Sequence, residues 1–70
     1  MKVLIKRDVF ESVLYRRGIT NKEFAENIGI TSNTMSYILN GKRAPSQKTA
    51  KKIVEALDLN FEDVFEIKKV

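Results

Sequence analysis

Fifteen consecutive residues, Asn27 to Gly41, carry no charged side chain, although 31% of the chain is Asp, Glu, Lys or Arg. This uncharged segment is not simply apolar. It contains neutral side chains that donate and accept hydrogen bonds: Thr31, Ser32, Asn33, Thr34, Ser36 and Asn40. Two cations, Lys42 and Arg43, follow it directly. Such a surface could match the hydrogen-bonding groups of a polar ligand, with positive charge at its edge to hold an anion.

The positive charge is concentrated in the middle of the chain. No acid occurs between Glu26 and Glu55, whereas the segment between them holds five cations. The remaining residues carry eight cations and nine acids, and the whole chain has a net charge of +4. This distribution is typical of a protein that binds nucleic acid or another polyanion. Charge alone leaves open the alternative of a solvated surface whose acids lie elsewhere.

Length and composition exclude several classes of protein. Seventy residues make one small domain, residues 1–70, near the lower limit for a self-sufficient core. The chain has no Cys and no His, so neither a disulfide nor a zinc cluster can staple it, and the lack of Cys favours a cytoplasmic protein. No apolar run approaches the roughly 18 residues of a membrane span, and "MKVLIKRD" is too short and too charged for a signal peptide. We expect no membrane partner, cofactor or small-molecule ligand.

Start and stop signals predict five helices. Thr20 and Glu23 form a capping box, and Thr31, Ser46 and Asn60 are further N-cap residues. The three glycines fall where helices end in a left-handed residue, and Asp58 takes the corresponding place before Asn60. The expected helices span about 7–17, 21–28, 32–40, 47–57 and 61–66. The tails "KVLIK" and "FEIKKV" alternate with period two, which predicts a short antiparallel pairing of the termini.

Apolar residues at helical spacing predict the core. They are Phe10, Val13, Leu14, Phe24, Ala25, Ile28, Met35, Ile38, Leu39, Ile53, Val54 and Leu57. The second and third helices are separated only by a short turn that contains Gly29, and two short helices joined in this way form a helix-turn-helix unit. Ala25 is expected where these two helices cross most closely.

The segment "GITNKEFAENIGITSNTMSYILNGKRAPS" resembles the helix-turn-helix of the XRE family, the DNA-binding domains related to Cro and the lambdoid phage repressors. "TAKKIVEALDLNFEDVF" resembles that family's fourth and fifth helices, so the similarity covers about residues 7 to 65. It implies an all-α, compact five-helix lambda-repressor-like domain. Three departures occur: Asn21 where Gln is frequent, Leu39 where Glu is common, and Asp58 where Gly is usual.

The resemblance makes the helix over 32–40 the recognition helix. Neutral side chains can enter the DNA major groove and pair with base edges, whereas a carboxylate would be repelled by the phosphates. The expected base-contacting residues are Ser32, Asn33, Thr34, Ser36 and Tyr37. Asn33 suits bidentate adenine recognition. The simpler alternatives are a solvated surface amide for Asn33 and a ring packed under a loop for Tyr37.

Phosphate contacts are expected on both sides of that helix. The candidates are Asn21, Lys22, Asn40, Lys42, Arg43 and Lys48. Such contacts position a protein on DNA without reading its sequence. Asn40 could also serve as a helix C-cap. Arg16 and Arg17 are expected to be solvated cations that complement the dipole of the first helix.

These features together predict a sequence-specific DNA-binding transcriptional regulator, a repressor, that binds a palindromic operator in double-stranded DNA as a two-fold homodimer. The expected dimer surface is Leu59, Phe61, Val64, Phe65 and Ile67, some of which must complete the monomer core. The alternative is a protein-interaction module such as an antitoxin or anti-repressor. No enzyme is expected, because neither a nucleophile-base set nor paired carboxylates nor a glycine-rich phosphate loop is visible.

Overall fold

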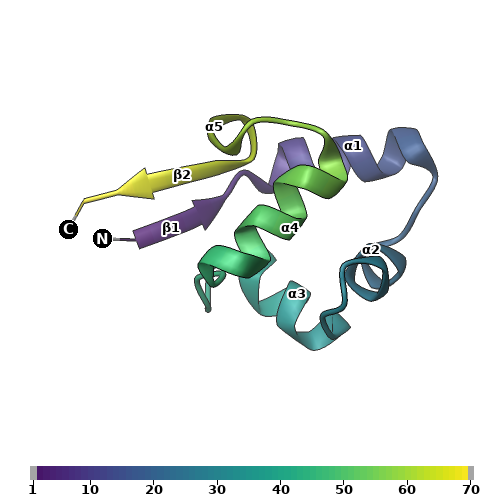
Figure 1. Ribbon diagram of the computed structural model, residues 1–70, viewed down its shortest axis with the longest axis horizontal. Coiled ribbons are helices and arrows are strands. Elements are labelled where there is room, and N and C mark those ends of the chain that lie inside the picture. The colour runs from purple at the N-terminus through teal and green to yellow at the C-terminus, as the bar shows by residue number, and fades with distance from the viewer. Residues whose placement is uncertain (1, 70) are drawn as a thin grey trace.

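The computed structural model describes residues 2–69 and contains five helices between two terminal strands (Figure 1). In chain order the elements are β1 (Lys2–Ile5), α1 (Arg7–Arg17), α2 (Asn21–Asn27), α3 (Ser32–Leu39), α4 (Gln47–Leu57), α5 (Phe61–Val64) and β2 (Phe65–Lys68). The predicted five helices are confirmed, and so is the predicted pairing of the termini. None of the helices within residues 2–69 has the length and apolar composition needed to cross a membrane.

The two strands form an antiparallel ribbon that projects from one end of the helical body and brings both termini together (Figure 1). Val3 lies opposite Ile67, and Ile5 lies opposite Phe65. The predicted end of the fifth helix at residue 66 is wrong. Phe65 already has the extended backbone of a strand (φ −123°, ψ 157°), so α5 ends at Val64.

Side-chain caps fix where the helices begin. In the capping box of α2, the Thr20 hydroxyl accepts from the Glu23 N–H and the Glu23 carboxylate accepts from the Thr20 N–H, both at 3.1 Å. The Thr31 hydroxyl accepts from the Thr34 N–H at 3.1 Å and so fixes the start of α3. Each cap satisfies N–H groups that have no partner within their own helix.

The turn between α2 and α3 depends on Gly29, whose φ of +80° is a conformation that residues with a side chain rarely adopt. The Ile30 N–H returns to the Ala25 carbonyl at 2.9 Å. Ala25 itself is fully buried. Its small side chain therefore lets α3 pack closely against α2, as the sequence predicts.

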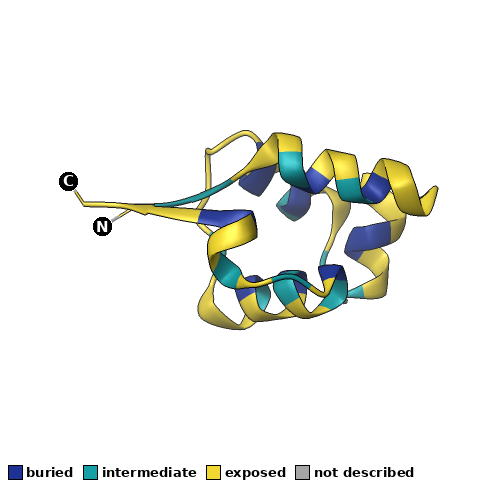
Figure 2. Ribbon diagram, turned by 90° about the horizontal axis from the view of Figure 1, so that it is seen from above, coloured by how far each residue is buried: buried dark blue, intermediate teal, exposed yellow. Residues whose placement is uncertain are grey.

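One core cluster lies between α1 on one side and α4 on the other (Figure 2). The rings of Phe10 in α1 and Phe24 in α2 meet edge to face, with their centroids 5.1 Å apart. Most of the predicted core residues are buried. The exceptions are Val13, Ile28 and Val54, which are only partly buried.

Three further residues are buried: Ala50, which was not predicted as core, and Val64 and Phe65, which belong to the set from which some were expected to complete the core. Val64 is fully buried and Phe65 is 2% exposed, so these two members of the predicted dimer surface are not on the surface. They close the core where α5 leads into β2. Leu59 and Phe61 are partly buried, and Ile67 is 49% exposed.

Arg17 is not the freely solvated cation that the sequence suggests. Its guanidinium donates to the carbonyl oxygens of Ala56 at 2.6 Å and Leu57 at 2.8 Å. These carbonyls belong to the last turn of α4, where a helix has no internal donors left and its dipole favours a cation. Arg17 therefore ties the end of α1 to the end of α4.

Replacing Arg17 with Met, which keeps the apolar stem but removes the donors, is expected to lower the free energy of unfolding by about 1–2 kcal/mol. Urea denaturation followed by circular dichroism would measure the change. Arg16→Met is the matched control, because no hydrogen bond of Arg16 fixes another helix within residues 2–69. Equal stability of the two variants would contradict the capping role of Arg17.

Candidate nucleic-acid interface

Helix α3 presents a neutral polar face to solvent. Ser32, Asn33, Ser36 and Tyr37 are exposed and form what we call the α3 outer face. Ser32 and Ser36 are one helical turn apart, as are Asn33 and Tyr37, so the four side chains are neighbours. The opposite face of α3 carries Met35, Ile38 and Leu39, which are all buried. This apolar anchoring is what points the polar face outward.

Thr34 lies at the edge of this face and not at its centre. It is partly buried, and its hydroxyl accepts from the Thr31 hydroxyl at 2.9 Å. Its side chain also lines a hollow between α3 and the start of α4, together with Arg43 and Ser46. Thr34 is therefore less available for an outside partner than the four residues of the α3 outer face.

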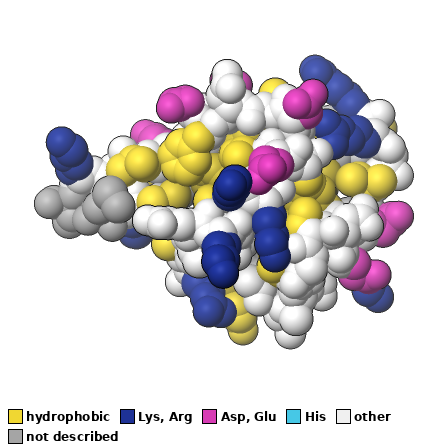
Figure 3. Space-filling model, in the orientation of Figure 1, with side chains coloured by type: hydrophobic (Ala, Val, Ile, Leu, Met, Phe, Trp, Pro, Cys, Tyr) yellow, Lys and Arg dark blue, Asp and Glu magenta, His cyan; other side chains and the backbone are white. Residues whose placement is uncertain are grey.

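The loop after α3 holds Lys42 and Arg43 against the end of that helix. Their backbone N–H groups both donate to the Tyr37 carbonyl oxygen, at 2.9 Å for Lys42 and 3.3 Å for Arg43. Both residues are exposed. Figure 3 shows Lys and Arg side chains running down α4 to this loop, while most carboxylates lie along the other edges. The cations predicted beside α3 are thus placed there by backbone hydrogen bonds.

Asn40 connects the end of α3 to α1 through Arg7, which the sequence did not single out as a site residue. The Arg7 guanidinium donates to the Asn40 side-chain oxygen at 3.1 Å and to the Glu11 carboxylate at 2.7 Å. The Asn40 amide lies 3.5 Å from the Ser36 hydroxyl. Arg7 therefore adds a cation beside the α3 outer face, with its charge partly balanced by Glu11. No local pattern could have indicated it, because 33 residues separate Arg7 from Asn40.

The remaining predicted phosphate contacts lie at helix starts. Asn21 and Lys22 are exposed in the first turn of α2, outside the side-chain pair of its capping box. Lys48 is exposed in the first turn of α4. All six predicted phosphate-contacting residues are therefore on the surface, which is the least that contact with a polyanion requires.

The chemical groups of this surface suit recognition of a polar, anionic partner. Exposed hydroxyl, amide and phenol groups offer donors and acceptors, and the nearby cations offer attraction to an anion. Within residues 2–69, no three His, Cys, Asp or Glu side chains gather where they could hold a metal ion.

Comparisons with known proteins agree with this geometry. A family model described as helix-turn-helix matches residues 14–64. The chain is 33% identical over 64 residues to YvzC, an uncharacterized HTH-type transcriptional regulator of Bacillus subtilis (strain 168), covering 91% of this chain and 83% of that relative. The crystal structure of a candidate DNA-binding protein from Bacteroides fragilis matches with a TM-score of 0.71 at 26% identity, covering 91% of this chain and 98% of that one. The chain belongs to the XRE family of helix-turn-helix proteins.

Proposed function

We propose that this protein is a DNA-binding transcriptional regulator that inserts α3 into the major groove of double-stranded DNA. The observation that carries the proposal is the α3 outer face, which is exposed, uncharged and bordered by Lys42 and Arg43. The major groove is wide enough to admit an α-helix, and each base pair presents a distinct pattern of donors and acceptors there. The names of the relatives, an HTH-type transcriptional regulator and a candidate DNA-binding protein, support the same function.

Base recognition is assigned to the α3 outer face. The Asn33 side chain can donate to N7 and accept from N6 of one adenine, which is the bidentate pairing that asparagine makes best. Ser32 and Ser36 can each donate or accept, so they suit several bases. Tyr37 has an exposed hydroxyl one turn beyond Asn33, where it can reach a base edge or the sugar-phosphate backbone. Thr34 contributes from the edge of the face.

Phosphate contacts are assigned to the residues around that face. They are Asn21, Lys22, Asn40, Lys42, Arg43 and Lys48, to which the structure adds Arg7 as a neighbour of Asn40. These residues come from α1, α2, α4 and the segment that joins α3 to α4. A rigid body that contacts the backbone at several points fixes the register of α3 in the groove, so that each base contact meets one defined base pair.

One copy of the protein makes few base contacts. Each contact of good geometry contributes about 1–3 kcal/mol of discrimination against the wrong base. We therefore infer a two-fold homodimer on a palindromic operator, with half-sites about 34–36 Å apart. Its surface is assigned to Phe61 and Ile67, which line an apolar groove with Val3 and Val54. Leu59 does not line this groove but a separate hollow beside α1, so we place it at the edge of the dimer surface. Occupation of an operator blocks other proteins from that DNA, which makes repression the expected outcome.

Selection of bound duplexes from a random pool, repeated at two salt concentrations, tests this function. We expect enrichment of a palindromic consensus at both concentrations, with weaker overall binding at the higher one. Enrichment of a single half-site without symmetry would contradict the dimer only. No enrichment at either concentration would contradict sequence-specific DNA binding itself.

The cations beside α3 give a separate quantitative expectation. Lys42→Ala should reduce the slope of log affinity against log salt by about 0.9 per half-site, because one fewer phosphate is neutralised. Fluorescence anisotropy at several salt concentrations measures this slope. Arg16→Ala is the control, since Arg16 lies in the last turn of α1 and has no assigned DNA contact, so the slope should not change. An unchanged slope for Lys42→Ala would remove that residue from the interface.

A further inference from the structure

We propose that Arg7 is a positioning residue for base recognition, which acts through Asn40 and makes the Ser36 hydroxyl of the α3 outer face a hydrogen-bond donor. This assignment rests on the proposed function, because it concerns how one residue of that face reads a base. A serine hydroxyl by itself can donate or accept, so its own chemistry does not select one base over another. The selection comes from the neighbours of Ser36.

Arg7 is held in place by its own helix. Its Nε donates to the Glu11 carboxylate at 2.7 Å, one turn further along α1. The two side chains are 55% and 48% exposed, so this ion pair adds little to the stability of the fold. It does set the direction of the planar guanidinium, whose Nη1 donates to Asn40 Oδ1 at 3.1 Å. Arg7 thereby connects the start of α1 to the end of α3.

The contact with Arg7 decides which way the Asn40 amide is turned. A guanidinium has N–H donors and no acceptor, so the Asn40 atom that faces it must be the carbonyl oxygen Oδ1. The amide nitrogen Nδ2 is therefore turned to the other side, where it lies 3.5 Å from Ser36 Oγ. This distance is at the long end for a hydrogen bond. What matters for Ser36 is the direction of the amide, which the shorter contact with Arg7 sets.

The turned amide leaves the Ser36 hydroxyl one useful polarity. With the N–H donors of Asn40 on one side, the Ser36 oxygen accepts there and its hydrogen points away from them. Because Ser36 is exposed, that hydrogen can be donated to a base. Guanine and thymine carry acceptors on their major-groove edges, whereas cytosine offers only the N4 donor. We therefore expect Ser36 to favour guanine or thymine and to reject cytosine.

Anisotropy titrations of the selected operator, with each base placed in turn at each position of the half-site, test this inference. The position that Ser36 reads is the one at which Ser36→Ala loses the base preference of the unaltered protein. There the unaltered protein should bind guanine or thymine about 3- to 10-fold more tightly than cytosine, the range that one neutral hydrogen bond contributes. A preference for cytosine at that position, or the lack of any such position, would overturn the inference.

Two substitutions test the path from Arg7 to Ser36. Arg7→Met should reduce the preference over cytosine to less than about twofold, because the Asn40 amide is then free to turn and Ser36 can donate or accept. Asn40→Asp should reduce it at least as far, since the introduced carboxylate accepts the Ser36 hydrogen and leaves lone pairs toward the base. The preference is a ratio of two affinities of one variant, so the general effect of a changed charge cancels.

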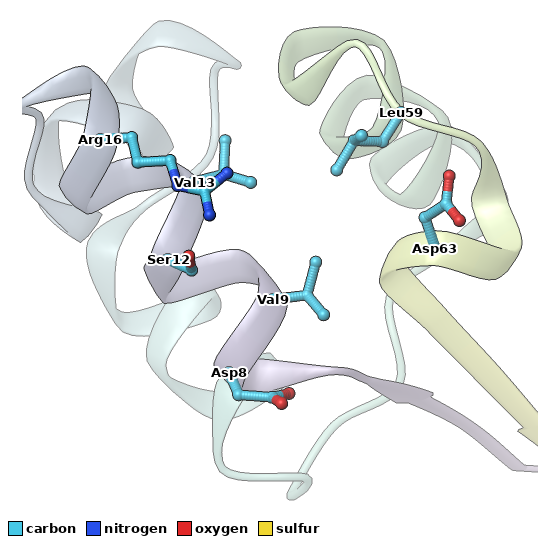
Figure 4. Close-up of a pocket in the computed structure, with 7 residues that line it drawn as sticks. All are labelled: Asp8, Val9, Ser12, Val13, Arg16, Leu59 and Asp63. Carbon is cyan, nitrogen blue, oxygen red and sulfur yellow. The ribbon is translucent and has the colours of Figure 1, made fainter.

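Two control variants carry the same changes of charge away from Asn40. Arg16→Met removes a cation from the other end of α1, where Arg16 lines a hollow with Val13 and Leu59 (Figure 4). Asn27→Asp introduces a carboxylate at the end of α2. Both controls should keep the base preference of the unaltered protein. All the changed side chains are exposed, so circular dichroism should show every variant folded.

The outcomes separate a positioning role from simpler ones. If Arg7→Met lost the same affinity for every base and had a smaller salt slope, Arg7 would be a phosphate contact and not a positioning residue. An unchanged preference in Asn40→Asp would place the Ser36 hydrogen elsewhere, as on the carbonyl four residues earlier in α3, and would equally contradict the role of Arg7. Either result on a selected operator would leave the proposed function standing, whereas failure to select any operator would contradict that function itself.

Discussion

Replacing Asn33 with alanine is expected to weaken binding to the selected operator by about 1–3 kcal/mol for each half-site, roughly 5- to 150-fold. The side chain is exposed and its removal leaves the buried face of α3 intact, so the free energy of unfolding should change by less than about 0.5 kcal/mol. The variant should also tolerate any base at one position of the half-site, because the lost amide is what distinguishes that base. Anisotropy titrations against the operator and its single-base variants would measure both effects.

Asn27→Ala is the matched control, since Asn27 is an exposed amide at the end of α2 without an assigned contact. It should bind the operator as the unaltered protein does. If Asn33→Ala lost the same affinity for the operator and for random DNA, Asn33 would be assigned to a contact with the phosphate backbone. No loss on either would contradict the base-reading role of the α3 outer face.

Phe24→Ala is expected to have the largest effect on stability, a loss of about 3–5 kcal/mol. The Phe24 ring is 2% exposed and meets the ring of Phe10 edge to face, so its removal leaves a cavity between α1 and α2. A core in a domain of this size supplies only about 3–5 kcal/mol in all. The variant should therefore be largely unfolded at 25 °C and should not bind DNA.

Thermal and urea unfolding followed by circular dichroism would measure that loss. Tyr15→Ala is the aromatic control, because its ring is 89% exposed and its removal should change monomer stability by less than about 0.5 kcal/mol. A cooperative unfolding transition of Phe24→Ala within 1 kcal/mol of the unaltered protein would contradict the assigned role of the Phe10–Phe24 pair.

The helices and the α3 outer face could be predicted from the sequence because the signals for them are local. Thr20 and Glu23 are three residues apart, and each satisfies the other's backbone within one turn. The spacing of Met35, Ile38 and Leu39 fixes which side of α3 is buried. The outward direction of Ser32, Asn33, Ser36 and Tyr37 follows from that spacing without knowledge of the rest of the fold.

What the sequence did not reveal depends on residues that are distant along the chain. Arg7 reaches Asn40 across 33 residues, and Arg17 reaches Ala56 across 39. No periodicity or capping rule links such pairs. The burial of Val64 and Phe65 likewise depends on where β2 meets β1, which the alternation of the tails indicates only in outline. A residue at the end of the chain can fill either the core or an interface, and only the packed structure separates the two.

We expect Asn33 to read an adenine from the major groove. The most direct test of this expectation replaces each operator adenine in turn by 7-deazaadenine, which loses the N7 acceptor of the major groove but keeps its base pairing. The unaltered protein should lose affinity at one adenine in each half-site, and Asn33→Ala should bind the modified and unmodified operators equally. If no single adenine mattered to the unaltered protein, or if Asn33→Ala remained as sensitive as the unaltered protein, Asn33 would not be the residue that reads this base.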